Sequence, residues 1–502
     1  MKFTISTALL LFLTVVAMGQ TPTQTNTQFP NPGFEAYQEH TSASSASNSY
    51  TNPKKVPYNW HTFDEANAAM TGLAALGNST AKQNHHNYFT AGGKDGAYFE
   101  MICKSVNLVI LEIPANGALS CGRTNVSSTT AASPDNYNYT DLNTSSSYST
   151  SKKFSWSFVG CPDSMSFYYR TQIKNSSHHP LFKVFLHGNA EFRDRANGSL
   201  YGNSTAELIG CSVDTFSRFQ STTDWKREVK AFMYTRPGQG GSEYTFKGQT
   251  ASVNANGYYS SLNRPTYMLA SFSTEKKAGT GTDGDKLAVD ELWCIYDKGL
   301  KTLSINGASQ TSMLNTFNNA EFATHEPSRT YNSIGKDGVG DPIFNNSGTA
   351  SANYTEFVCF NSTTELENLV SVTPKSKLIT NLTKVGTIPS SGYPYVTITI
   401  THNDNSTFAY TIYFTGTLVD PTVTQTQTPC GAGNATLAVS NPDANCTYSW
   451  YSSNSSSSAI ATGTSLTRNI SANTTFYVEA SRSGCKSNRV AFEAAVSPKP
   501  AT

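Results

Sequence analysis

Short segments with the composition of β-strands recur along almost the whole chain. Each is rich in β-branched and aromatic residues and is bounded by clusters of Gly, Pro, Asn or Ser. The clearest examples are residues 106–113, 154–159, 165–170, 181–186, 227–234, 266–272, 395–400 and 408–414. Because helical segments do not alternate with these strands, the pattern predicts an all-β protein made of antiparallel sandwiches and argues against a parallel α/β sheet.

One segment has the composition of a longer helix. Residues 64–76 are rich in Ala and are followed by Gly77 and Asn78, a combination that often ends a helix. A loop with a single helical turn is the alternative for this segment.

Residues 395–414 have the pattern of a β-hairpin. Val396, Ile398 and Ile400 alternate with threonines, which predicts a half-buried strand with its apolar side chains on one face. Residues 403–405 (Asn-Asp-Asn) tolerate the positive φ angles that a tight turn requires.

The overall composition narrows the class of protein. A chain of 502 residues favours about three domains. Its 36 basic and 35 acidic residues leave a formal net charge of +1, which gives no broad electrostatic surface for a nucleic acid, so we expect no such partner. The 26 Tyr and 27 Phe residues exclude general disorder, because disordered chains are poor in aromatic residues.

The N-terminus predicts export. Lys2 precedes an apolar run over residues 7–17, and Ala17-Met18-Gly19 supplies the small residues of a cleavage site. We therefore expect a signal peptide over residues 1–19 and a mature chain that starts near Gln20. The apolar run is shorter than the roughly 20 residues that span a bilayer. The protein is predicted to be secreted, extracellular or at the outer cell surface, and not membrane-spanning.

The cysteines are too sparse for a disulfide scaffold. None forms a C-x-x-C pair, and their odd number leaves at least one thiol unpaired. The nine positions are Cys103, Cys121, Cys161, Cys211, Cys294, Cys359, Cys430, Cys446 and Cys485.

The chain divides into three blocks. We expect the first over residues 28–297 and a smaller β-sandwich over residues 298–418. A Thr-, Gln- and Pro-containing linker over residues 419–429 then leads to a third block over residues 430–496.

The third block contains YSWY at residues 448–451, TTFYVEA at residues 474–480 and a Gly-Cys pair ending at Cys485. It resembles the immunoglobulin-like modules appended to secreted Bacteroidetes proteins. The resemblance implies an immunoglobulin-like sandwich with a disulfide between Cys430 and Cys485, which leaves Cys446 over; two free buried thiols are the alternative. Such modules act as spacers or adhesion units.

The first block contains a series of short motifs in a characteristic order. They are NPGFE (31–35), PYNW (57–60), GAYF (96–99), CPDSM (161–165), DWK (224–226), RP (264–265) and KLAVDELWCIYD (286–297). In this order they resemble the family called putative carbohydrate metabolism domain of secreted Bacteroidetes proteins. That resemblance implies a jelly-roll sandwich similar to carbohydrate-binding modules. The second block resembles the small β-sandwich that commonly follows it.

Catalytic motifs are absent from the sequence. Glycoside hydrolases need two carboxylates about 5–9.5 Å apart, and no spacing singles out a pair. The acidic candidates are Asp95, Glu100, Glu191, Asp194 and Asp290. The chain also lacks G-x-S-x-G, H-E-x-x-H and phosphate-loop patterns. We therefore expect a non-catalytic protein that binds a polysaccharide or glycan. A glycoside hydrolase and a structural or adhesion surface protein, with other cell-surface proteins as partners, are the alternatives.

The resemblance also implies a structural calcium ion in the first block. It maps the cation ligands to Glu35 and Asp290, with Asn31 or a neighbouring carbonyl as a third oxygen. Calcium takes 6–8 oxygen ligands, so main-chain carbonyls and water would supply the rest. The alternative is that Glu35 and Asp290 are ordinary hydrogen-bonded rim residues. After Asp290 the family pattern leads us to expect a second Asp, whereas this chain has Glu291, and the role of Glu291 is therefore open.

Five residues of the first block are candidates for sugar binding. We expect Trp60 to be a stacking platform in a loop, because sugar rings stack on aromatic side chains through their C–H faces. Tyr169, Arg170 and His187 are expected to contribute near strand ends, with His86 from a loop. Core packing is the alternative for each aromatic residue. Tyr169 and Arg170, as neighbours in a strand, face opposite sides and can cooperate only near its end.

Overall fold

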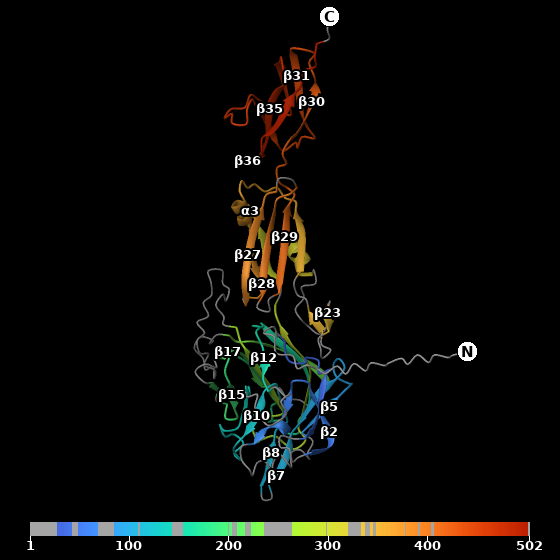
Figure 1. The fold of residues 1–502 in the computed structure, drawn as a ribbon, viewed down its shortest axis with the longest axis vertical. Helices are drawn as coiled ribbons and strands as arrows, with labels where there is room; N and C mark the ends of the chain where they lie inside the picture. Colours follow the sequence, from blue (N-terminus) through green and yellow to red (C-terminus); the bar gives the residue numbers. More distant parts are fainter. Residues whose placement is uncertain are drawn as a thin grey trace, which may run out of the picture.

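The protein is all-β, and its parts follow one another along an elongated molecule (Figure 1). The computed structural model describes residues 28–42, 49–68, 85–108, 111–142, 154–198, 200–202, 208–215, 222–234, 264–297, 299–319, 333–336, 342–344, 348–376, 378–389, 392–402 and 406–499. The predicted signal peptide and the turn at residues 403–405 lie outside these ranges. No helix in the described ranges is long and apolar enough to cross a membrane.

Two facing antiparallel sheets form the first sandwich. One contains, in order, β17 (Leu208–Thr215), β14 (Leu181–His187), β19 (Tyr267–Ser273), β9 (Ala118–Ser120) and β3 (His61–Thr62), with β12 (Trp156–Ser157) paired to β19. The other contains β18 (Thr222–Ala231), β13 (Ser164–Gln172), β20 (Lys286–Ile295), β6 (Tyr98–Ile102) and β5 (His86–Phe89). The chain crosses between the sheets at β13–β14, β17–β18, β18–β19 and β19–β20, as strands of a jelly roll do.

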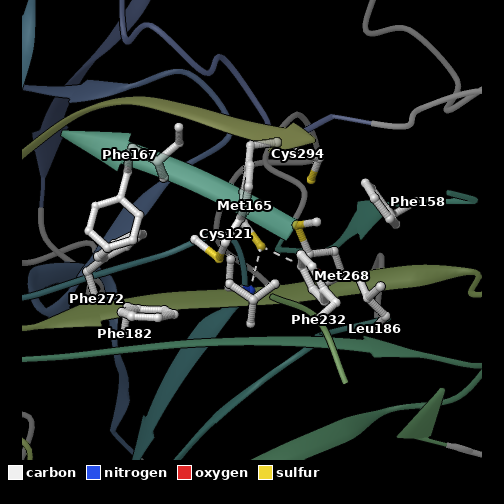
Figure 2. Packing of buried hydrophobic residues seen from close by; sticks show 14 of the residues in the cluster. Cys121, Phe158, Met165, Phe167, Phe182, Leu186, Phe232, Met268, Phe272 and Cys294 are labelled. Carbon is white, nitrogen blue, oxygen red and sulfur yellow. Dashed lines mark hydrogen bonds between the residues drawn. The ribbon is translucent and has the colours of Figure 1, made fainter. Parts of the chain in front are cut away.

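Large aromatic and sulfur-containing side chains fill the space between these sheets. Phe167 of β13 packs against Phe182 and Phe272 of the opposite sheet, with ring centroids 5.2 and 5.3 Å away (Figure 2). Cys121 lies in the same core and accepts a hydrogen bond from the amide of Ala270 (Figure 2). Alternation along each strand places these residues inside and their neighbours outside.

A third sheet supplements the first sandwich. It contains β16 (Leu200–Gly202), β15 (Phe192–Arg195), β11 (Tyr137–Tyr139), β10 (Arg123–Val126) and β4 (Asn67–Ala68). Phe192 of β15 packs on Phe185 of β14, in a cluster separate from the main core. Two hairpins are formed by β1 (Tyr37–Ser42) with β2 (Ser49–Pro57) and by β7 (Lys104–Leu108) with β8 (Leu111–Ala115).

The second sandwich has its own core. One sheet contains β25 (Gly348–Tyr354), β29 (Thr407–Phe414), β28 (Tyr395–His402) and β27 (Ile379–Thr387), and the other β22 (Ala308–Ser309), β21 (Leu300–Ile305) and β26 (Val370–Pro374). The remaining elements are helices α2 (Thr311–Asn319) and α3 (Thr363–Leu369) and the pair β23 (Ser333–Lys336) and β24 (Pro342–Phe344). Val396, Ile398 and Ile400 are fully buried and pair with β29, which confirms the predicted alternation.

The third sandwich is built around Trp450. One sheet contains β30 (Thr422–Gln427), β31 (Gly433–Ser440) and β34 (Ser465–Ile470). The other contains β33 (Ala461–Thr462), β32 (Thr447–Tyr451), β35 (Thr474–Arg482) and β36 (Cys485–Lys486), with β37 (Val490–Ala494) paired to β35. The Trp450 ring is fully buried, and its Nε1 donates a hydrogen bond to the Gly463 carbonyl at 2.9 Å.

One prediction of local structure is wrong. Residues 106–113 span parts of two strands, β7 and β8, instead of one. For residues 64–76, the described start fits the alternative of a loop with a helical turn, because a 3-10 turn over Phe63–Glu65 is followed there by β4; residues 69–76 lie outside the described ranges.

The predicted disulfide is also wrong. Cys485 pairs with Cys359, which follows β25 in the second sandwich. Cys430 is free and exposed, and it forms an isolated β-bridge with Ser497, close to the C-terminal end of the described chain. Cys485 lies on β36, near the second sandwich (Figure 1), so the two cysteines of the predicted pair lie at opposite ends of the third sandwich.

Candidate functional site

Trp60 is a core residue, which corrects its prediction as a stacking platform. Its side chain is fully buried, and its ring centroid lies 5.9 Å from that of Phe34 and 6.4 Å from that of Phe272. Its Nε1 donates a hydrogen bond to the Pro30 carbonyl at 2.6 Å. The turn that begins at Pro57 folds the ring inward, because the Trp60 amide closes it on the Pro57 carbonyl.

The two histidines predicted at the site are buried as well. His187 Nε2 lies 2.7 Å from the Thr140 hydroxyl, and its ring stacks between Phe192 and Tyr267. Burial lowers the pKa of His187 to about 4, so its ring is neutral at physiological pH. His86 is 3% exposed and stacks on Phe99. Neither ring is available to a sugar, and both predictions are corrected.

Tyr169 and Arg170 are not brought together. The ring of Tyr169 lies 6.2 Å from that of Phe167 and packs against the core of the first sandwich. Arg170, the next residue of β13, faces the opposite side of its sheet, away from the core of the first sandwich. Among the five predicted residues, Arg170 alone therefore lies on that outer face together with partly exposed aromatic side chains.

Two aromatic residues flank Arg170, and a third stacks on one of them. Its guanidinium carbon lies 4.7 Å from the ring centroid of Tyr98 on β6 and 4.4 Å from that of Trp225 on β18. Tyr98 contacts Trp225 edge to face at 5.4 Å, and Phe89 of β5 stacks on Tyr98 at 4.6 Å. Phe89 is exposed, Trp225 and Arg170 are half-buried, and Tyr98 is buried beneath them. We call these four residues the Trp225 cluster.

The loop over residues 90–97, which joins β5 to β6, borders this cluster. Trp225 Nε1 donates a hydrogen bond to the Gly92 carbonyl at 3.3 Å. On the other side of the loop, Asp290 Oδ2 accepts from the amides of Lys94 at 2.6 Å and Asp95 at 3.3 Å. Glu35 Oε1 accepts from the Ala97 amide at 2.9 Å. Side chains from three distant segments thus hold the loop in place.

Two glycines make this arrangement possible. A Cβ on Gly93 would lie 2.6 Å from Asp290 Oδ2, and Gly96 has a φ of +83° with the Glu35 carboxylate against its Cα. A side chain at either position would displace the carboxylate that binds the loop. The Gly-rich sequence of this loop is therefore explained by the close approach of two acidic residues.

Burial gives the carboxyl groups beneath the loop unusual acidities. It raises the pKa of Asp290 to about 8, with a further contribution from the neighbouring Glu291, against three main-chain amides that lower it. It also raises the pKa of Glu291 to about 7, although the Trp293 indole donates to that carboxylate. Glu291 has a φ of +54°, a strained backbone conformation of the kind that clusters at functional sites.

The predicted calcium ligands are only partly assembled. Glu35 and Asp290 do bind the same loop, but the Asn31 amide is used on both sides by the main chain of Ala36. Within the described ranges, no group of three His, Cys, Asp or Glu side chains could hold a metal ion by itself. A cation at Glu35 and Asp290 would therefore need main-chain carbonyls and water for most of its ligands.

Three of the other acidic candidates have basic partners. Glu100 accepts from Lys286 Nζ at 3.1 Å and from the Asn87 amide at 3.0 Å. Asp194 is 2.8 Å from Lys183 Nζ, and Glu191 pairs with Arg193. These carboxylates are bound within the protein and do not present an opposed catalytic pair.

Comparison with known proteins identifies the third sandwich. Residues 419–498 match the family model described as Ig-like domain CHU_C associated. Two solved structures show weak likenesses: a "putative glycoside hydrolase" from Bacteroides thetaiotaomicron (14% identity, 55% of this chain and 72% of that one, TM-score 0.31) and another from Bacteroides vulgatus (16%, 53% and 97%, 0.28). Such TM-scores do not establish a shared fold. No curated protein matches the chain at a significant level.

Proposed function

We propose that this protein is a secreted or cell-surface, non-catalytic carbohydrate-binding protein. It holds a polysaccharide or glycan on the outer face of the sheet formed by β18, β13, β20, β6 and β5, here called the ligand sheet. The observation that carries the proposal is the Trp225 cluster. Half-buried Trp225 and exposed Phe89 lie at the two sides of Tyr98 on the outer face of the sheet, and sugar rings stack on aromatic side chains of this kind. Sugar hydroxyls also need fixed hydrogen-bonding groups, which Arg170 and the main chain of the 90–97 loop supply.

Preorganisation supports this assignment. The cluster sits on four strands of one sheet, and the loop beside it is held by Asp290, Glu35 and Trp225. A site whose side chains are already ordered loses less conformational entropy when it binds. Asp290 and Glu35 act here as positioning residues.

A glycoside hydrolase is the second candidate, and one observation favours it. The raised pKa values of Asp290 and Glu291 resemble those of carboxylic acids that act as proton donors near neutral pH. Asp290 is, however, fully buried and accepts three main-chain hydrogen bonds. That bonding supports a positioning role over proton transfer to a substrate.

The remaining sandwiches fit a role in presentation. We propose that the second and third sandwiches space the first away from the cell surface or from other surface proteins. The match of residues 419–498 to an Ig-like model supports a spacer or adhesion unit at this end. Export itself rests on the predicted signal peptide at residues 1–19.

We also propose that a structural calcium ion binds between Glu35 and Asp290. Supporting it, both side chains bind the 90–97 loop, and the Glu291 carboxyl lies close enough to interact electrostatically with both. A divalent cation would offset the electrostatic cost of burying these groups together.

A glycan-array screen of the mature protein, with product analysis on each bound glycan, tests the proposed function. We expect binding without release of reducing ends. Trp225→Ala should abolish that binding, while Tyr413→Ala, an exposed aromatic residue of the second sandwich, should leave it unchanged. Release of reducing ends would assign a hydrolase, and absence of binding to any glycan would favour the structural alternative.

A further inference from the structure

We infer that the ligand of the Trp225 cluster is an acidic polysaccharide, one anionic group of which pairs with Arg170. The inference rests on the proposed function and specifies its substrate class. It comes from the bonding of Arg170, which differs from that of the other arginines stacked on aromatic rings.

Within the described residues, four other arginines lie over an aromatic ring and also bind a carboxylate. Arg123 lies over Phe154 and pairs with Asp141, and Arg193 lies over Tyr137 and pairs with Glu191. Two arginines of the third sandwich show the same combination. They are Arg482, with Phe357 of the second sandwich and Asp443, and Arg489, with Tyr451 and Glu479.

Arg170 has two aromatic neighbours and no carboxylate partner within the described part of the chain. The nearest acidic side chain of β6, Glu100, is already bound to Lys286 and Asn87. Asp290 is bound to the main chain of the loop. The guanidinium therefore carries a charge that the sheet face does not neutralise, although it is half-buried between rings.

The neighbouring rings limit how an anion can approach. Tyr98 and Trp225, whose rings lie at 81° to each other, cover part of the guanidinium, and the Tyr98 hydroxyl interacts with it as well. The remaining N–H groups at its edge are left for a ligand. A planar carboxylate binds such an edge through two parallel hydrogen bonds. Lys94, whose ammonium lies 5.2 Å from the Tyr168 ring, adds positive charge on the same side of the sheet.

The aromatic rings place this charge within a sugar-binding surface. Phe89 and Trp225 lie on either side of Tyr98, so sugar units before and after an acidic unit could stack while its anionic group meets Arg170. A uronate carboxylate and a sulfate ester share this chemistry. The guanidinium edge matches the planar carboxylate better, and the experiment separates the two sources.

The test uses the mature protein and four polymers: polygalacturonate, its methyl ester, dextran sulfate and neutral dextran. The methyl ester keeps the sugar rings and removes the charge. We expect polygalacturonate to bind at least about tenfold more tightly than its ester, and added salt to reduce that difference. Arg170→Gln should abolish the difference but keep weak binding of the ester. Arg170→Lys retains the positive charge but not the paired N–H groups of the guanidinium. This variant should therefore keep only part of the difference in affinity between the acid and its ester.

Controls make each outcome informative. Circular dichroism and melting temperature establish that the variants fold, and Trp225→Ala should lose both the acid and the ester. Dextran sulfate binding that depends on Arg170 would support the anionic ligand and identify a sulfate source. Equal affinity for acid and ester, or a ratio unchanged in Arg170→Gln, would overturn the inference while leaving carbohydrate binding intact. Failure to bind any glycan on an array would instead remove the proposed function.

Discussion

Trp60 and Trp225 belong to the same sandwich but have opposite environments. Trp60 lies between the two sheets and is fully buried, whereas Trp225 lies on the outer face of the ligand sheet and is half-buried. Trp60 contacts three phenylalanines, and Trp225 contacts a tyrosine and an arginine. Removing the two rings should therefore have different effects.

Trp60→Ala should lower the free energy of unfolding by about 3–5 kcal/mol, because it leaves a large cavity in a packed core. Denaturant unfolding followed by circular dichroism measures this. Trp225→Ala should cost less, because its ring is only half-buried on the outer face of the sheet. If Trp60→Ala unfolds at the wild-type denaturant concentration, the assignment of Trp60 to the core is wrong.

At the scale of single elements, the buried carboxyl groups of β20 and the 90–97 loop interact electrostatically, because Asp290 accepts hydrogen bonds from the loop amides. The pKa of Asp290 is raised to about 8 and that of Glu291 to about 7, from ordinary values of 3.8 and 4.5. A carboxyl group whose pKa is raised in the folded state favours folding while it is protonated. That contribution is lost as pH rises through the folded pKa.

In a chelator, the melting temperature of the first sandwich should therefore fall as the pH rises from about 4 to about 8, the interval between the ordinary and the raised pKa values of these two groups. Glu291→Gln should make the fall smaller, because it removes one of the two buried acids. Millimolar calcium should also make it smaller, since a bound cation stabilises the ionised carboxylates. Scanning calorimetry at several pH values gives the comparison. Identical curves in calcium and chelator would rule out a calcium site at Glu35 and Asp290.

The strands and the third sandwich could be predicted from sequence, whereas the site could not. The alternation at Val396, Ile398 and Ile400 specifies a buried face by itself. By contrast, Phe89, Tyr98, Arg170 and Trp225 come from four strands, and they meet only because of the register and order of the ligand sheet. Alternation around Tyr98-Phe99 and Asp224-Trp225-Lys226 does carry a signal, but it does not tell which face is outside. Trp60 misled because a turn can bury an aromatic residue as well as expose it.

At the scale of the whole molecule, the second and third sandwiches are covalently joined. Cys359 and Cys485 form a disulfide across their junction, and Arg482 of the third sandwich lies over Phe357 of the second at 4.2 Å. These contacts add to the chain connection that runs through Asp420, which binds Asn488. The disulfide should therefore limit motion between the two sandwiches.

Non-reducing peptide mapping should recover a linked pair of peptides that contain Cys359 and Cys485, with Cys430 available to an alkylating reagent. Reduction should increase protease cleavage within residues 415–421 and leave both sandwiches folded, because each has its own core. Cys359→Ser should reproduce the effect of reduction, and Cys430→Ser should have none. A linked peptide joining Cys430 to Cys485 would contradict this pairing.

Hydroxyl-radical footprinting of the mature protein tests directly whether a glycan binds at the Trp225 cluster, because it locates a bound ligand without any substitution. Labelling of each aromatic residue is measured with and without polygalacturonate. We predict protection of Trp225 and Phe89, with Tyr393 and Tyr413 of the second sandwich labelled equally in both states. Protection at Tyr393 and Tyr413, with Trp225 and Phe89 unchanged under saturating ligand, would contradict binding at the Trp225 cluster.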